Sequence, residues 1–299
     1  MRKRAGLNYL LPTPAKPDYL VLVNSFFGLE VPKDLPPLVA AVGPILSDEY
    51  PPLDDIHQRF LDWHAKTIYV ALGTHIILLH ADARKIIKGL IRAMEAGLID
   101  GVIWSVGKSG RQLFDTADQF TIAGQTRSIL DHAYARIYFT HGGGFSASEG
   151  LYHGKPMLVM PFFFDQISNA AKLAAGGTSE VLHKFRFTAE EVYTKMKLIL
   201  EDRDGSYGSN VLHLQRIAQG ASRRKQLGGP HRGDFVRYGA EGRGWEGDAA
   251  DASPDGGYAD ACLQGEELGP DGSFKLGAGL PGGRDILCDA IGVGASTGY

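Results

Sequence analysis

"FTHGGGFSASEGLYHGKPMLVMPFFFDQISNAAKL", residues 139–173, contains two apolar runs, and each run leads into a polar segment that suits a helix. A run that is apolar throughout is typical of a strand that is buried on both faces of a parallel sheet. Strand and helix alternating in this way indicate an α/β fold. The glycines 142–144 mark the turn between the first strand and its helix.

The same alternation extends outward from this stretch over residues 19–227. It predicts a doubly wound parallel sheet of the Rossmann-like type, in which helices cover both faces. The predicted strands lie at 19–24, 38–43, 67–73, 101–106, 135–141 and 157–163, and the predicted helices at 82–96, 146–153, 166–175, 188–202 and 210–225.

Composition excludes several classes of function. The chain has 299 residues, a formal charge of −3 and only two cysteines. This charge gives no reason to expect nucleic acid as a partner, and no apolar run approaches the roughly 18 residues of a membrane span. Two cysteines exclude a disulfide framework and favour a reducing compartment. We therefore expect a cytoplasmic protein without a membrane span.

The residues of the opening stretch suggest a ligand with phosphate and hydroxyl groups. Glycines at the start of a helix leave backbone N–H groups open to a phosphate, and Ser146 is placed either to cap that helix or to donate to a phosphate oxygen. Glu149, one turn later, can accept from both hydroxyls of a ribose. Asp165 and Gln166 follow the next strand, at the edge of the sheet where α/β domains bind ligands, and suit the hydroxyls of a sugar. Together these groups indicate a sugar nucleotide.

Two other interpretations of the stretch stay open at this point. Gly-rich turns, serine caps and exposed Asp-Gln pairs are each common in structures without any ligand. Gly142, Gly144 and Ala147 also match the spacing of a dinucleotide-binding fingerprint, with Asp165 at a suitable distance. That fingerprint usually opens a domain, whereas here at least three predicted strands come before it.

The stretch resembles the donor-binding signature of the UDP-dependent glycosyltransferases of the GT-B type. The signature has the form T-H-x-G-x-x-S-x-x-E, then G-x-P, then D-Q-x-x-N. The resemblance extends over about residues 6–227 and is closest to fungal members. The matching residues are Thr140, His141, Gly143, Ser146, Glu149, Gly154, Pro156, Asp165, Gln166 and Asn169.

The resemblance implies a role for each matched position. His141 contacts the diphosphate, and Glu149 holds the ribose. Asp165 and Gln166 hold hydroxyls of the transferred sugar. No metal or other cofactor is required in this family, because a helix N-terminus and the imidazole stabilise the departing UDP. The remaining implied donor-site residues are Gly143, Gly144 and Ser146 around the diphosphate, Gly73 and Thr74 opposite it, and Gln125 near the uracil.

The chain departs from the family pattern in two respects that concern the site. Such enzymes have two similar domains, and the amino-terminal one carries the acceptor pocket and a histidine base. We expect residues 1–18 to be a remnant of the connection between the domains, so that this chain carries the donor half alone. The segment before Gln125 is also short and lacks the tryptophan and proline that shape the base pocket, and Phe145 replaces a smaller residue beside the diphosphate.

Residues 228–299 have a different composition from the rest of the chain. They hold 19 of its 39 glycines and show no clear helical or strand periodicity. The plain interpretation is a disordered tail. An alternative is an out-of-frame translation, because reading suitable codons for 228–241 and 247–261 one base later yields sequences similar to the continuation of the fungal family.

The sequence therefore supports an enzyme hypothesis and a binding hypothesis. In the first, the chain supplies the donor half of an inverting transferase that moves a hexose, glucose in the simplest case, from UDP to a hydroxyl of a small lipophilic acceptor such as a sterol or another secondary metabolite. In the second, a truncated product binds the UDP-sugar without catalysis. A dinucleotide-binding domain is the remaining alternative.

Overall fold

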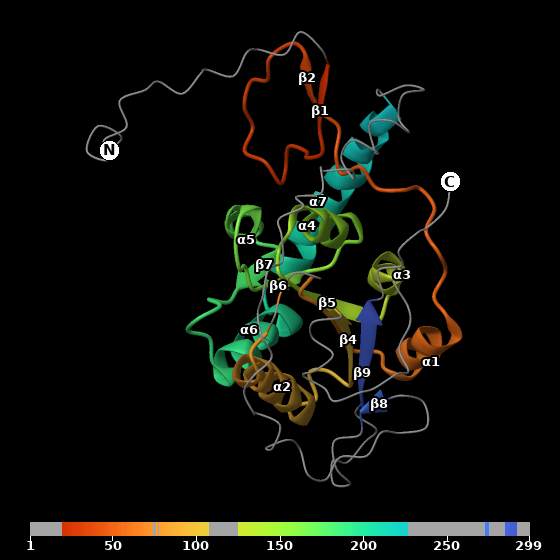
Figure 1. Cartoon of the computed structure of the whole chain (residues 1–299), viewed down its shortest axis with the longest axis vertical. Helices are drawn as coiled ribbons and strands as arrows, with labels where there is room; N and C mark the ends of the chain where they lie inside the picture. The colour runs from red at the N-terminus through yellow and green to blue at the C-terminus, as the bar shows by residue number, and fades with distance from the viewer. Residues whose placement is uncertain are drawn as a thin grey trace, which may run out of the picture.

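The computed structural model describes residues 20–73, 76, 78–107 and 125–226, and the backbone of two further strands at 273–274 and 285–291. Near the start, β1 (Val21–Val23) and β2 (Val39–Ala41) pair in parallel as a small sheet of their own. All other strands belong to one seven-stranded sheet, which lies between layers of helices (Figure 1).

The main sheet has the strand order β7-β6-β5-β3-β4-β9-β8, and every neighbouring pair is parallel except β8 with β9. This confirms the predicted parallel α/β fold. Because all carboxyl ends of the parallel strands share one edge, the segments that follow them come together there. The first five strands in chain order are β3 (Thr67–Ala71), β4 (Gly101–Gly107), β5 (Ala135–Thr140), β6 (Met157–Val159) and β7 (Ser179–Val181).

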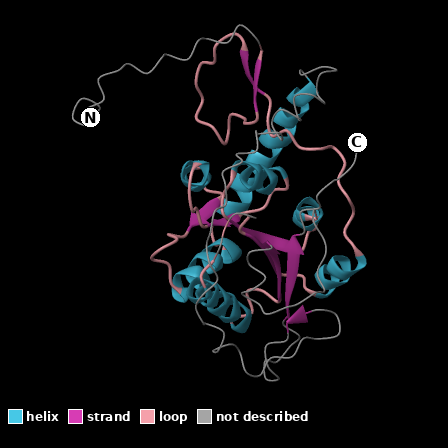
Figure 2. Cartoon of the chain, in the orientation of Figure 1, coloured by secondary structure: helices cyan, strands magenta, loops and turns pink. Residues whose placement is uncertain are grey.

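Helices cover both faces of this sheet (Figure 2). On one face, apolar residues of α2 (His80–Glu95) and α6 (Ala189–Glu201) share a core with the strands. The other face packs against the remaining helices, and its core includes Tyr69 and Tyr138 of the two central strands. These helices are α1 (Asp55–Trp63), α3 (Thr126–Asp131), α4 (Gly144–Tyr152), α5 (Asp165–Ala175) and α7 (Ser206–Ser222).

The five predicted helices are all present, whereas α1, α3 and β7 were not expected. These three elements have 9, 6 and 3 residues. Such short segments show little periodicity and depend on tertiary contacts. The Asp54 carboxylate caps α1 locally by accepting from the N–H groups of Ile56 and His57. The tertiary contact is made by Gln125, whose Nε2 donates to the same carboxylate.

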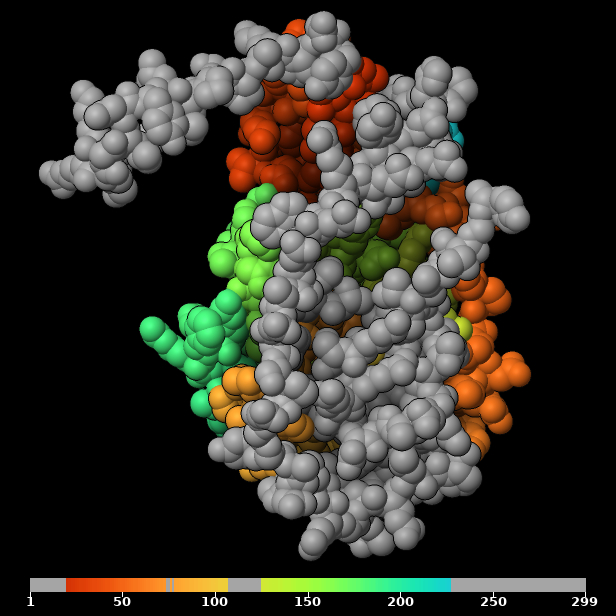
Figure 3. Space-filling model, viewed as in Figure 1, coloured from red at the N-terminus to blue at the C-terminus, as the bar shows by residue number. Residues whose placement is uncertain are grey.

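The segment from β1 to α1 packs against the sheet domain at its carboxyl edge. Phe26 is buried in the core with α5 and α7, and Glu30 forms an ion pair with Lys172 of α5 at 2.7 Å. In the space-filling view this segment (red) lies directly against α5 (green) (Figure 3). It is therefore part of the folded unit and not a free linker.

Two strands lie where the sequence led us to expect no regular structure. The backbone of β9 (Asp285–Ile291) pairs in parallel with all seven residues of β4, and β8 (Ser273–Phe274) pairs antiparallel with β9. An unpaired edge of β4 would expose its backbone N–H and C=O groups, and β9 covers them. The out-of-frame hypothesis stays a prediction about the transcript, which sequencing across the Leu227 codon tests.

Candidate functional site

The turn from β5 into α4 is built on glycine. Gly142 has φ +78°, which favours glycine, and a Cβ there would lie 2.7 Å from a side-chain methyl of Val159. Its N–H donates to the hydroxyl of Thr140 at 3.4 Å. Gly143 then occupies the N-cap position of α4, so its backbone stands at the start of the helix. The expected glycine turn at a helix N-terminus is therefore present.

The His141 ring is packed between two glycines, one in the loop after β3 and one in the loop after β5. A Cβ on Gly73, at the end of β3, would lie 2.9 Å from His141 Cε1, and one on Gly143 would lie 2.6 Å from its Nε2. Gly73 itself has φ +84°. Because Gly73 and Gly143 have no side chains, there is room for the imidazole between them. The structure brings together Gly73, His141 and Gly143, while Thr74 lies outside the described residues. Their contact with a diphosphate stays a prediction.

A hydrogen-bond network joins the two loops of the opening stretch. Asp165, the first residue of α5, accepts from the Gly144 N–H and from Asn169 Nδ2, both at 3.0 Å from its Oδ2. Asn169 Nδ2 also contacts the Gly142 carbonyl at 3.0 Å. The Asp165 side chain remains exposed. The N–H of Gly144, predicted to face a phosphate, is therefore already bonded to a carboxylate. Asn169 has a positioning role that the motif alone did not indicate.

Ser146 does not cap α4. The N-cap residue is Gly143, and no side chain caps the helix. Ser146 lies in the first turn of the helix, where its hydroxyl interacts with the phenol of Tyr138. The capping part of the prediction is therefore wrong, because the helix begins two residues earlier than expected.

Glu149 is a half-buried residue in the second turn of α4. Burial raises its pKa to about 7, and the Arg127 guanidinium opposes this shift. The carboxylate in turn adds to burial in raising the pKa of Tyr138. A desolvated carboxyl keeps its proton to a higher pH, and carboxyl groups with raised pKa values are frequent at functional sites.

The two glutamines of the predicted site are both buried, and each forms two hydrogen bonds within the protein. Gln125 precedes α3, donates from Nε2 to Asp54 Oδ2 at 3.1 Å and accepts from the Asp54 N–H at 3.3 Å. Gln166 accepts from the N–H groups of Phe162 and Phe163 with its Oε1. Both side chains thus hold neighbouring backbone in place, which their sequence positions did not reveal.

Arg127 is a buried cation that no motif pointed to. Its Nε lies 3.3 Å from Nε2 of His153, and its guanidinium stacks on the ring of Tyr50 at 4.3 Å. Burial lowers the pKa of His153 to about 4, although Asp131 opposes the shift. The neutral ring can therefore accept from Arg127 while its Nδ1 donates to Asp131. This cluster fixes the chain around 47–51 beside α3 and α4.

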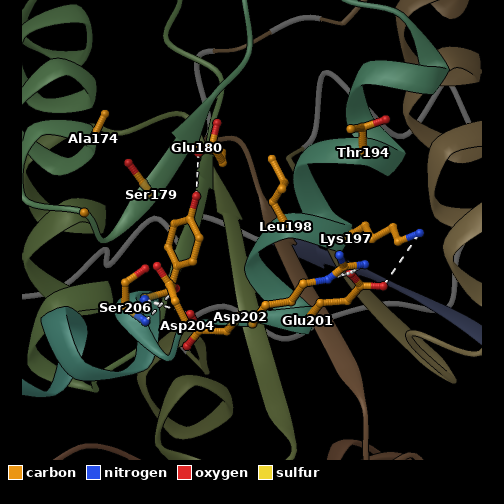
Figure 4. A pocket seen from close by; sticks show the side chains of 13 residues that line it. Ala174, Ser179, Glu180, Thr194, Lys197, Leu198, Glu201, Asp202, Asp204 and Ser206 are labelled. Carbon is orange, nitrogen blue, oxygen red and sulfur yellow. Dashed lines mark hydrogen bonds and ion pairs between the residues drawn. The ribbon is translucent and has the colours of Figure 1, made fainter.

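A cavity of about 740 Å³ lies at the opposite, amino-terminal edge of the sheet, between β7, α6 and α7 (Figure 4). Its acidic side chains have partners within the protein. Glu180 accepts from the Tyr207 hydroxyl at 2.6 Å, and Glu201 pairs with Arg203 at 2.9 Å. Asp202 accepts from two N–H groups at the start of α7. These interactions satisfy the acidic side chains without a ligand, whereas the hydroxyl of Ser179, which also lines the cavity, is buried without a hydrogen-bond partner.

The candidate site is therefore the carboxyl edge of β3, β5 and β6. It combines a glycine turn at a helix N-terminus, an imidazole between two glycines and an exposed carboxylate on the next helix. Among the residues that the structure describes, no group of three or more His, Cys, Asp or Glu side chains is arranged to hold a metal ion, and no helix is long and apolar enough to cross a membrane. Such a fold is an α/β domain with a parallel sheet, and its glycine turn at a helix N-terminus is of the kind that can hold a phosphate.

Comparison with known proteins identifies the family. The family model described as UDP-glucoronosyl and UDP-glucosyl transferase matches residues 12–222, and the chain belongs to this family. A UDP-glycosyltransferase of Talaromyces amestolkiae is 44% identical over 266 residues, which are 81% of this chain and 50% of that protein. UDP-glycosyltransferase stmC of Aspergillus ustus is 38% identical, over 90% of this chain and 52% of that protein. The chain thus spans about half the length of these relatives.

Solved structures support the fold. The structure of Os79 from O. sativa in complex with U2F and trichothecene matches with a TM-score of 0.56 and 18% identity, over 74% of this chain and 54% of that one. A further structure of Os79, in complex with UDP, matches with a TM-score of 0.55 at 19% identity. The expected relation to glycosyltransferases and their Rossmann-like domain is confirmed.

Proposed function

We propose that this chain binds a UDP-sugar at the carboxyl edge of β3, β5 and β6, and that it supplies the donor-binding part of a hexosyltransferase. The sugar is glucose in the simplest case, and the acceptor is a hydroxyl of a small lipophilic molecule. The observation that carries the proposal is the convergence of His141, the glycine turn and Asp165 at one edge of the sheet. Membership of the family and the UDP complex of Os79 add support.

Each group has a part in the proposed reaction. The acceptor oxygen attacks the anomeric carbon and loses its proton to a base, while the bond from that carbon to the diphosphate oxygen breaks and UDP leaves with the electron pair. His141 and the backbone at the start of α4 stabilise the charge on the departing diphosphate. Asp165 accepts from sugar hydroxyls, and Glu149 from the ribose. No metal takes part in this proposal, and the base belongs to another domain of the family's enzymes.

Calorimetric titration with UDP and UDP-glucose tests the donor site. His141→Ala is expected to lower the affinity for both ligands by about tenfold or more, because both carry the diphosphate. The matched control is His213→Ala, on the exposed side of α7, which is expected to leave both affinities unchanged. Equal affinity in the His141 variant and the parent chain would refute the assignment of the diphosphate to this loop.

The network around Asp165 changes how its role must be tested. Asp165→Ala removes the acceptor of the Gly144 N–H, so it disturbs the helix start as well as the sugar contact. Asp165→Asn retains an oxygen for Gly144, although its amide adds donors to the shared network. We expect Asp165→Asn to lower the affinity for UDP-glucose about tenfold and the affinity for UDP less than threefold. Equal losses for the two ligands would place Asp165 outside the sugar site.

Two experiments separate the remaining alternatives. NAD⁺ titrated in competition with UDP tests the dinucleotide hypothesis, which requires NAD⁺ to displace UDP. Release of UDP from UDP-glucose in the presence of sterol and phenol acceptors tests transfer. Donor binding without release would support the binding hypothesis for this chain, since it spans about half the length of its relatives.

A further inference from the structure

An exposed apolar surface borders the proposed sugar site. It consists of Phe145 on α4, Phe163 and Phe164 before α5, and Ile167 on α5, and we call it the apolar rim. These side chains are 68%, 36%, 85% and 60% exposed, respectively. Large apolar side chains gathered at one place on a surface indicate a binding surface more strongly than single exposed ones.

The backbone at the rim adopts an unusual conformation. Phe164 has φ 51° and ψ −131° at the N-cap position of α5, in a region that residues with a Cβ rarely occupy. Such a conformation is strained and persists only where surrounding contacts impose it. Here Gln166 holds the preceding N–H groups of Phe162 and Phe163. The Phe164 ring stands out in solvent, edge-on to Phe163 with centroids 5.1 Å apart.

The rim flanks the residue proposed to hold the sugar. Phe164 directly precedes Asp165, and Phe145 directly follows Gly144, whose N–H bonds Asp165 at 3.0 Å. Among residues 142–148 and 160–171, Asp165 is the only charged side chain. An acceptor hydroxyl that attacks a sugar held by Asp165 must bring the rest of its molecule close to these neighbours. The surface that it meets is aromatic and uncharged.

We propose that the apolar rim is the part of this domain that contacts the acceptor, and that Phe164 selects acceptors whose hydroxyl is carried on an apolar skeleton. This inference rests on the proposed function. An exposed aromatic ring offers a large apolar area for an apolar skeleton to cover.

Two product-like glycosides test the rim. With the protein saturated with UDP, n-octyl β-D-glucoside below its micellar concentration and methyl β-D-glucoside share the glucose and differ only in the alkyl group. We expect the octyl compound to bind about tenfold more tightly or better, because several methylenes would lie on the rim. Phe164→Asn should reduce this ratio to less than about threefold, with methyl glucoside and UDP affinities unchanged, because Asn is among the residues that occupy the positive-φ position of type II′ turns.

The controls distinguish the possible failures. Phe164→Ala should act like Phe164→Asn, whereas Trp63→Ala, which removes a 77% exposed ring on α1 far from the site, should leave the ratio unchanged. If UDP binds but the two glycosides bind equally, or if both Phe164 variants keep the octyl preference, the role of the rim is wrong while the donor site stands. If UDP itself does not bind the parent chain, the proposed function fails and the rim's role fails with it.

Discussion

Replacing Glu149 by glutamine should stabilise the folded protein at high pH and weaken its binding of UDP-glucose. Burial raises the pKa of Glu149 from 4.5 to about 7. This difference of about 2.5 pH units corresponds to about 3 kcal/mol that disfavours the ionised folded state. The penalty is absent below about pH 4.5, grows as the pH rises toward 7 because only the unfolded chain has lost the proton, and is complete above pH 7.

Binding should depend on pH in the opposite sense. If only the ionised carboxylate accepts from the ribose, about one molecule in eleven is competent at pH 6 and about ten in eleven at pH 8, so affinity should rise about tenfold. UDP-glucose is the suitable ligand, because its diphosphate does not titrate in this range. Glu149→Gln should bind it more weakly than the parent chain at pH 8, and the dependence on pH between 6 and 8 should become smaller.

Urea denaturation at pH 5 and pH 8, and calorimetry with UDP-glucose at pH 6, 7 and 8, measure both effects. A stability difference between Glu149→Gln and the parent chain that is equal at pH 5 and pH 8 would show that burial does not perturb this carboxyl. Identical pH profiles of UDP-glucose binding in the two proteins would remove Glu149 from the ribose site.

Three other substitutions test the packing around the site. Gly142→Ala forces a Cβ to 2.7 Å from a methyl of β6 at φ +78°; we expect a loss of roughly 2–4 kcal/mol in urea denaturation, and weaker UDP binding by calorimetry. Arg127→Met removes the stacking on Tyr50 and the hydrogen bond to the Ser47 carbonyl, so unfolding should become easier by about 2–3 kcal/mol, and limited proteolysis should cut the segment 47–51 faster. Lys172→Met leaves Glu30 without its ion-pair partner, and thermal melts should show a loss of about 1 kcal/mol or less that shrinks at high salt.

The role of a site residue could be predicted from sequence only where its partners lie close to it along the chain. The position of His141 followed from a strand that ends in glycines, and the structure places its ring beside Gly143 as expected. The involvement of Gln125 with Asp54 spans 71 positions of sequence, and no local pattern encodes such a contact. Phe164 could have been suspected from three consecutive phenylalanines, but its left-handed backbone is a property of the folded loop.

The sequence by itself determined the fold class, most helices and strands of residues 20–226, and the family signature. Apolar periodicity, glycine turns and motif spacing are all properties of residues that are neighbours in the sequence. The sequence did not reveal β9 beside β4, the bond between Gln125 and Asp54, or the bond between Asp165 and Gly144. The tertiary structure decided these, since hydrogen bonds between distant segments form only where packing brings their groups together. It likewise decided the high pKa of Glu149, because desolvation depends on everything that surrounds the carboxyl group and not on its neighbours in sequence.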